Sequence, residues 1–343
     1  MKRKSFLGSL LGSPFLAAAS FQSNHHSETP FTDDTAWRIP PYLKPGDTIG
    51  ITCPAGYMTQ AEIQPAVQVL RSWGFNLHVG KTVGLRDFIF GGTDAERLAD
   101  FQQMLDDPTI QAIMCARGGY GCVRIIDQID WRKFVVAPKW IIGFSDITVL
   151  HAQLNHRYHI ASIHSKMCNS FPEHPEEAEK GQWESILSIQ TALSGHAVEY
   201  PVVYDSSNRR GSGLGILAGG NCKTIESLAG SDSDLRTDGM ILFLEDAGEY
   251  LYSIDRMFYN LKRSGKLANL NGLLIGGFRV KPDDPGDEFG RSVYNIVMGQ
   301  VAEFNYPVCF NFPVGHQKSN YALKCGVRHE LQITDDRVVF REA

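Results

Sequence analysis

Short apolar runs alternate with segments of helical periodicity from Ile39 to about residue 154. The runs at 47–55, 75–79, 110–116 and 140–143 predict strands, and the segments 60–73, 94–105, 123–129 and 147–154 predict helices. Strands that alternate with helices across short loops are typical of a parallel sheet with helices on both faces. Such sheets bind ligands beyond the carboxyl ends of their strands, so we expect a site at that edge.

The alternation breaks between about residues 171 and 210, where the chain becomes polar and rich in proline and glutamate. We therefore predict an N-terminal domain over 38–170, a crossing over 171–210 and a C-terminal domain over 211–343. In the last of these, apolar runs at 239–246 and 273–278 predict strands, and the periodic segment 253–265 predicts a helix. The predicted fold class is α/β, in two domains.

The first twenty residues have the three parts of a secretory signal: a basic start at 2–4, a short apolar middle and small residues up to Ser20. We predict a signal peptide over 1–20, a flexible leader over 21–37 and export, with a periplasmic location. The alternative is a disordered or interfacial N-terminal helix, in which case the protein would be cytoplasmic.

Composition narrows the possible functions. The chain has 343 residues and a net charge of −5, so it lacks the basic footprint of a nucleic-acid-binding protein. No run of eighteen apolar residues follows the N-terminal segment, and no membrane span is expected. The seven cysteines include no CxxC pair, so the spacing of a zinc site is absent, and buried free thiols are the favoured interpretation.

The run from Trp140 to Thr148 places Ser145 between a predicted strand and a predicted helix, after Gly143. A serine on such a turn exposes its hydroxyl near backbone N–H groups, which is the placement that acyl-transfer enzymes need. The alternative is that Ser145 only caps the helix.

Two further side chains follow apolar runs and could act with this serine. Glu245 follows the run 241–244, and His316 follows the run 310–315. A serine hydroxyl needs a base to take its proton, and a histidine base needs an acceptor that fixes its tautomer. Asp246 or Glu249 could replace Glu245 as this acceptor, and His316 could be an ordinary turn residue.

The run from Arg117 to Gly121 carries paired glycines after a predicted strand. It could offer a backbone N–H to an oxyanion, beside the N–H of Asp146. A phosphate-binding loop is the weaker alternative, because neither GxxxxGK[ST] nor GxGxxG is present.

Taken together, these motifs resemble the LD-carboxypeptidase family of serine peptidases, which also includes the microcin C self-immunity amidases. The resemblance covers roughly residues 38–335. It is carried by six motifs in the family's order: 43–47, 116–121, 138–139 with 143–148, 219–221, 244–249 with 254–257, and Gly315-His316 with Asn320.

The resemblance implies that Ser145 is the nucleophile, that His316 is the base and that Glu245 orients it. It implies oxyanion donors in the N–H groups of Gly119 and Asp146, and a substrate-lining role for Arg117. It further implies a β-rich α/β C-terminal domain, an active site between the domains, and often a homodimer. The implied activity uses no metal or other cofactor and removes terminal D-alanine from a peptidoglycan tetrapeptide.

The chain departs from the family pattern at two places beside the expected site. His164-Ser165-Lys166-Met167 stands where the family commonly has His-Gly-Pro-Met, and the segment 315–326 lacks a usual leucine-proline pair. These departures leave the substrate open. An amidase acting on a peptide–nucleotide antibiotic and a catalytically silent protein that binds wall peptides are the alternative functions.

Overall fold

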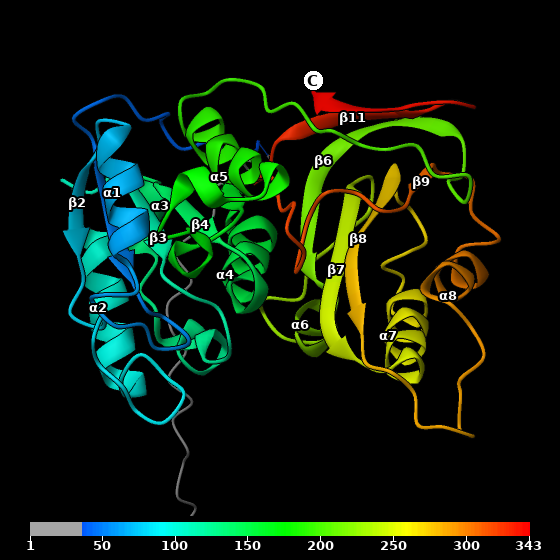
Figure 1. Cartoon of the computed structure of the whole chain (residues 1–343), viewed down its shortest axis with the longest axis horizontal. Helices are drawn as coiled ribbons and strands as arrows, with labels where there is room; N and C mark the ends of the chain where they lie inside the picture. The colour runs from blue at the N-terminus through cyan, green and yellow to red at the C-terminus, as the bar shows by residue number, and fades with distance from the viewer. Residues whose placement is uncertain (1–35) are drawn as a thin grey trace, which may run out of the picture. The chain divides into compact units, whose positions relative to one another are not determined.

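The computed structural model describes residues 36–343 (Figure 1). The predicted signal peptide, and all of the predicted leader except its last two residues, lie outside the described part. Within that part, no helix has both the length and the apolar character needed to cross a membrane.

The first half of the chain, together with β10 from the C-terminal part, forms a six-stranded sheet in the order β10-β5-β4-β3-β1-β2. The five strands from β1 to β5 are parallel, as the strand–helix alternation predicts, and β10 is antiparallel to β5. Residues of β3 and β4 are buried throughout because helices cover both faces. These strands are β1 (Thr48–Thr52), β2 (Asn76–Val79), β3 (Ala112–Cys115), β4 (Trp140–Gly143), β5 (Ser162–His164) and β10 (Leu323–Cys325).

The predicted helices of this half differ in how well they form. Thr93 and Glu96 make a reciprocal capping box at the start of α2, which fixes its first turn. The predicted helix 123–129 is instead two 3-10 turns, Cys122–Arg124 and Ile126–Gln128, because so short a segment without a capping side chain is a marginal helix. The helices are α1 (Gln64–Ser72), α2 (Asp94–Asp106), α3 (Arg132–Val136) and α4 (Thr148–Gln153).

The second half forms another six-stranded sheet, in the order β12-β11-β6-β7-β8-β9. Strands β6 to β9 are parallel, and β11 is antiparallel to both β6 and β12. The strands are β6 (Gly211–Asn221), β7 (Ile241–Glu249), β8 (Gly272–Val280), β9 (Val308–Cys309), β11 (Arg328–Ile333) and β12 (Val338–Glu342). The helices are α6 (Cys222–Ser227), α7 (Leu251–Arg263) and α8 (Val293–Gln300).

The segment expected as a crossing, 171–210, contains the helix α5 (Lys180–Leu193). Its buried residues, among them Ile186 and Ile189, belong to the core of the first sheet. In addition, β10 comes from the C-terminal part of the chain but completes the first sheet beside β5. Sequence pattern alone missed both features, because a three-residue strand and a polar helix start carry little periodicity.

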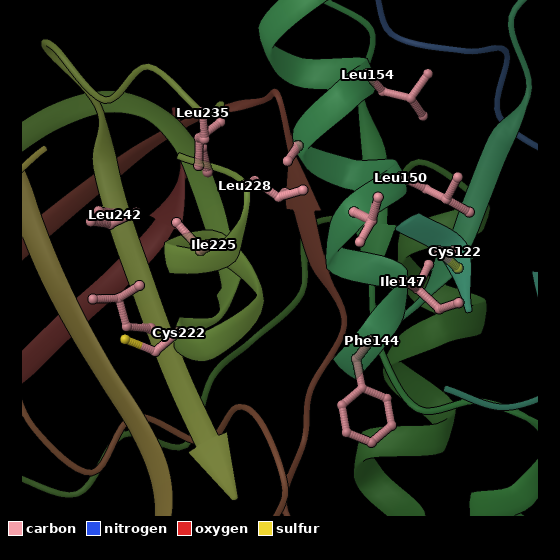
Figure 2. Close-up of a cluster of buried hydrophobic side chains, with 14 of the residues drawn as sticks. Cys122, Phe144, Ile147, Leu150, Leu154, Cys222, Ile225, Leu228, Leu235 and Leu242 are labelled. Carbon is pink, nitrogen blue, oxygen red and sulfur yellow. The ribbon is translucent and has the colours of Figure 1, made fainter. Parts of the chain in front are cut away.

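One apolar cluster joins the two sheets through α4 and α6, which pack against each other between them (Figures 1 and 2). Ile147 and Leu150 enter this cluster from the first half, and Ile225, Leu228 and Leu242 enter it from the second. Buried apolar surface stabilises contacts at about 25 cal/mol per Å². This shared core therefore holds the carboxyl ends of β4 and β7 in one arrangement, which decides where the site residues meet.

Candidate active site

Ser145 lies on the turn between β4 and α4 in a left-handed backbone conformation, with φ +64°. A non-glycine residue in this region is strained, and such strain is concentrated at functional sites. Two glycines make the turn possible. A Cβ on Gly143 would lie 2.8 Å from Ile147, and a Cβ on Gly118 would lie 2.9 Å from the Cβ of Ser145. Ser145 is the first residue of a 3-10 turn whose cap position is Phe144, and within residues 36–343 the Ser145 side chain makes no hydrogen bond, which argues against the cap interpretation.

Glu245 and His316 form a directly hydrogen-bonded pair. The Nδ1 of His316 lies 2.6 Å from Oε2 of Glu245, and the backbone N–H of His316 donates to the same oxygen at 3.1 Å. Glu245 is a fully buried residue of β7. Gly315 adopts φ +101° and brings the histidine loop against this carboxylate, while its N–H donates to Oδ1 of Asn320 at 2.8 Å. Glu245, rather than Asp246 or Glu249, is thus the partner of His316.

This pair sets the electrostatics of the imidazole. Burial lowers the pKa of His316, but the hydrogen bond and the negative charge of Glu245 outweigh burial, so the pKa is raised overall. With Nδ1–H donating to the carboxylate, the neutral ring leaves Nε2 as a free acceptor. The side chain retains 23% exposure, so this nitrogen can be reached from a cavity.

Ser145 and His316 line the same cavity, of about 290 Å³, to which both halves of the chain contribute. Gly119 and Asp146 also line it, and Gly119 has φ +100°. Within residues 36–343, the N–H of Gly119 has no protein acceptor. The Asp146 carboxylate accepts the N–H of Cys122 at 2.8 Å, which fixes the glycine loop next to Ser145. Burial raises the pKa of Asp146.

The structure thus brings Ser145, His316, Gly119 and Asp146 to one cavity, with Glu245 behind the histidine. In the described part of the chain, no direct hydrogen bond joins Ser145 to His316; catalytic hydrogen bonds are often long without substrate and tighten when it binds. Arg117 does not line the cavity. Its exposed side chain lies 5.9 Å from the centre of the Tyr57 ring instead.

Two further cavity residues, Asn221 and Asp246, were not predicted as site residues, although Asp246 was an alternative partner for His316 and Asn221 belongs to the motif 219–221. The Asn221 side chain caps α6 by accepting the N–H of Thr224 at 3.0 Å. The backbone N–H of Asn221 donates to the hydroxyl of Thr148, in the other half of the chain, at 3.0 Å. Asp246 accepts the N–H groups of Lys223 and Ala247, each at 2.7 Å, and burial raises its pKa to about 6. The glycine pair before Asn221 and the two acids that end the predicted strand 239–246 were the sequence signals for these positions.

The departure at 164–167 lies beside the site. The ring of His164 is fully buried between Phe144 and Phe243, with centroid distances of 5.8 and 4.9 Å. Lys166 is only 6% exposed, and its ammonium donates to the backbone carbonyl of Gln317, next to His316, at 3.5 Å. Burial lowers the pKa of Lys166 to about 8.

Protein-family models match the two halves of the chain separately. Residues 49–165 match the LD-carboxypeptidase N-terminal domain, and residues 214–331 match the LD-carboxypeptidase C-terminal domain. The chain is 31% identical over 283 residues to the murein tetrapeptide carboxypeptidase of Pseudomonas aeruginosa, which covers 81% of this chain and 91% of that protein. It is 26% identical over 329 residues to the microcin C7 self-immunity protein MccF of Escherichia coli, covering 88% and 94%.

Among solved structures, the muramoyltetrapeptide carboxypeptidase of Oxalobacter formigenes superposes with a TM-score of 0.75. The match covers 86% of this chain and 98% of that one, at 24% identity, and so shows a common fold.

Proposed function

The chain belongs to the LD-carboxypeptidase family and is a hydrolase, and from that membership we propose that it releases terminal D-alanine from peptidoglycan tetrapeptides. The bond cut is the amide that joins an L-configured centre to D-alanine. The relative that is 31% identical carries the name murein tetrapeptide carboxypeptidase, which supports this substrate class. The single observation that carries the mechanism is the Glu245–His316 pair, whose histidine lines the same cavity as Ser145.

In the proposed cycle, Nε2 of His316 takes the hydroxyl proton of Ser145 as Oγ attacks the scissile carbonyl carbon. The carbonyl oxygen becomes an oxyanion, held by the N–H groups of Gly119 and Asp146. The imidazolium, stabilised by Glu245, gives its proton to the amine of D-alanine, which leaves as the C–N bond breaks. Water then attacks the acyl-enzyme, with His316 again taking the proton, and restores the serine hydroxyl.

The left-handed conformation of Ser145 supports its role as the nucleophile, because it turns a residue at the end of a buried strand toward the cavity. Three further properties are part of the proposal: export through residues 1–20, a homodimeric state, and a reaction that needs no metal. Chelation with EDTA should accordingly leave the rate unchanged, and N-terminal sequencing of exported protein should start near residue 21.

The test is to incubate purified protein with a tetrapeptide ending in D-alanine and to follow the free amino acid by mass spectrometry. Wild type should release D-alanine and leave the tripeptide, whereas Ser145→Ala should not. No release by wild type, or equal release by both, would refute the proposal. Binding without turnover would instead favour the silent wall-peptide-binding protein.

The second candidate is an amidase that cuts a microcin C-type peptide–nucleotide with the same three side chains. The 26% identity to MccF over most of both chains favours keeping this candidate. Parallel assays on the tetrapeptide and on an aminoacyl sulfamoyl nucleoside separate the two. Turnover of the nucleoside conjugate alone would replace the first proposal with the second.

A further inference from the structure

The Tyr57 ring lies next to two arginine side chains close to the proposed nucleophile. The guanidinium of Arg86 is 4.2 Å from the ring centre, and that of Arg117 is 5.9 Å from it. The three residues come from the loops after β1, β2 and β3, so they gather at the carboxyl edge of the sheet that also carries Ser145.

Neither guanidinium is neutralised by the protein. Within residues 36–343, no carboxylate lies within 4.0 Å of Arg86 or Arg117, and the only hydrogen bond of either is from Nε of Arg86 to the Phe88 carbonyl, at 2.9 Å. By contrast, the neighbouring Arg97 and Arg124 both pair with Asp94. Two exposed guanidiniums without a carboxylate partner, held beside one aromatic ring, suit the binding of an anion.

The carboxylate of Glu62 does not neutralise Arg117 either. The positive charge of Arg117 contributes to lowering the pKa of Glu62. However, the larger causes of that shift are the hydrogen bonds from Thr59, whose N–H and hydroxyl both donate to Oε2 of Glu62, at 2.7 and 2.9 Å. Glu62 is therefore occupied by Thr59 and does not form an ion pair with Arg117.

Backbone contacts tie this cluster to the reacting centre. Arg117 precedes Gly118, whose missing Cβ leaves room for Ser145. The N–H of Gly56, next to Tyr57, donates to the carbonyl of Gly118 at 2.9 Å. Arg117 is therefore bonded directly to the glycine loop that borders the nucleophile, and a Cβ on Gly56 would lie 3.4 Å from its Cδ, so the cluster adjoins that loop.

The cavity itself has the opposite charge. Asp146, Asp246 and Glu249 line it, and its one lysine, Lys223, pairs with Glu226 at 3.2 Å, while the histidine that lines it, His316, is hydrogen-bonded to Glu245. A carboxylate inside the cavity would face these acids, whereas a carboxylate at the arginine cluster would meet two free cations. Charge complementarity therefore separates the reacting amide from the anionic end of a substrate.

We propose that Arg86 and Arg117, on the Tyr57 ring, bind the free C-terminal carboxylate of the substrate. This inference rests on the proposed carboxypeptidase function and explains how the enzyme would cut only one residue from the end. The D-alanine carboxylate would sit at the cluster while its amide reaches Ser145. Loss of the carboxylate charge should then weaken recognition as much as loss of an arginine.

The test compares the tetrapeptide acid with the same peptide ending in D-alaninamide. Wild type should prefer the acid in kcat/KM. Arg86→Gln and Arg117→Gln should each reduce the acid-to-amide ratio by about 10- to 100-fold, the effect of losing a hydrogen bond to a charged group. Arg132→Gln is the matched control, because Arg132 is an exposed arginine of α3 and pairs with Asp130.

An unchanged acid-to-amide ratio in both cluster variants would overturn the inference, as would an equal drop in the control. Binding of the two peptides to Ser145→Ala, measured by calorimetry, separates this outcome from a failure of the proposed function. If wild type cleaves neither peptide, the carboxypeptidase proposal fails. The subsite is still supported if the protein binds the acid more tightly than the amide and Arg117→Gln abolishes this preference. Equal binding of acid and amide refutes it.

Discussion

Replacing Gly315 with alanine tests whether the contact between the histidine loop and Glu245 controls activity. A Cβ at this position would lie 2.4 Å from the Cβ of Glu245 and 2.6 Å from its Oε2. The residue also has φ +101°, which an alanine adopts only with strain. We expect about 1–3 kcal/mol of lost stability from the strained backbone and about 1–3 kcal/mol more from the collision.

The same collision should act on the reaction, because Glu245 cannot move away without moving His316. A displacement of about 1 Å at a reacting group can cost on the order of 100-fold in rate. We therefore expect Gly315→Ala to lower kcat/KM for D-alanine release by about 100-fold, equivalent to about 2.7 kcal/mol. Thermal unfolding of the same protein measures the stability loss.

Gly286→Ala is the matched control, since Gly286 has φ +86° and no atom lies within 4 Å of its added Cβ. This variant carries the backbone strain without the collision, and it should retain its activity. If Gly315→Ala keeps kcat/KM within about threefold of the control, the close packing of the loop on Glu245 does not control catalysis.

Three other predictions follow from burial and charge. Because the pKa of His316 is raised, kcat/KM should fall as pH drops through a value above 6.5. Glu245→Gln should slow the reaction and move this acidic limb of the pH profile to lower pH. An acidic limb that stays in place would contradict the assignment of the base. Lys166 carries a buried ammonium whose pKa falls to about 8, so its charge destabilises the fold below pH 8 and wild-type stability should rise between about pH 8 and 10.5. Lys166→Met should therefore stabilise the protein by up to about 3 kcal/mol at pH 7. Denaturant titration should show that this gain in stability shrinks above pH 8. No gain at pH 7 would show that the ammonium has further partners. All seven cysteines are buried free thiols, so a thiol reagent should label the native protein only as fast as it unfolds, and rapid labelling would contradict their burial.

The parallel strands of the first sheet were predictable because each is a short apolar run between helical segments and needs no partner to be recognised. The predicted strand 140–143 matches β4, and the predicted helix 94–105 matches α2 to within one residue. By contrast, β10 could not be predicted, since its three residues are a strand only because β5 offers an unpaired edge. The helix α5 was likewise hidden behind a polar, proline-rich approach.

For the site, the sequence by itself determined which chemical groups are available and that each follows an apolar run. Local sequence also favoured the turn at Ser145, because Gly143 leaves space for Ile147, whereas the space that Gly118 leaves for Ser145 is a contact between the loops after β3 and β4. Only the tertiary structure decided that Glu245, and neither Asp246 nor Glu249, meets His316, and that Arg117 turns toward Tyr57. The physical reason is that these contacts join residues 71 and 60 positions apart, so only the folded chain brings them together; the packing of the Gly315 loop against β7 fixes the first of them.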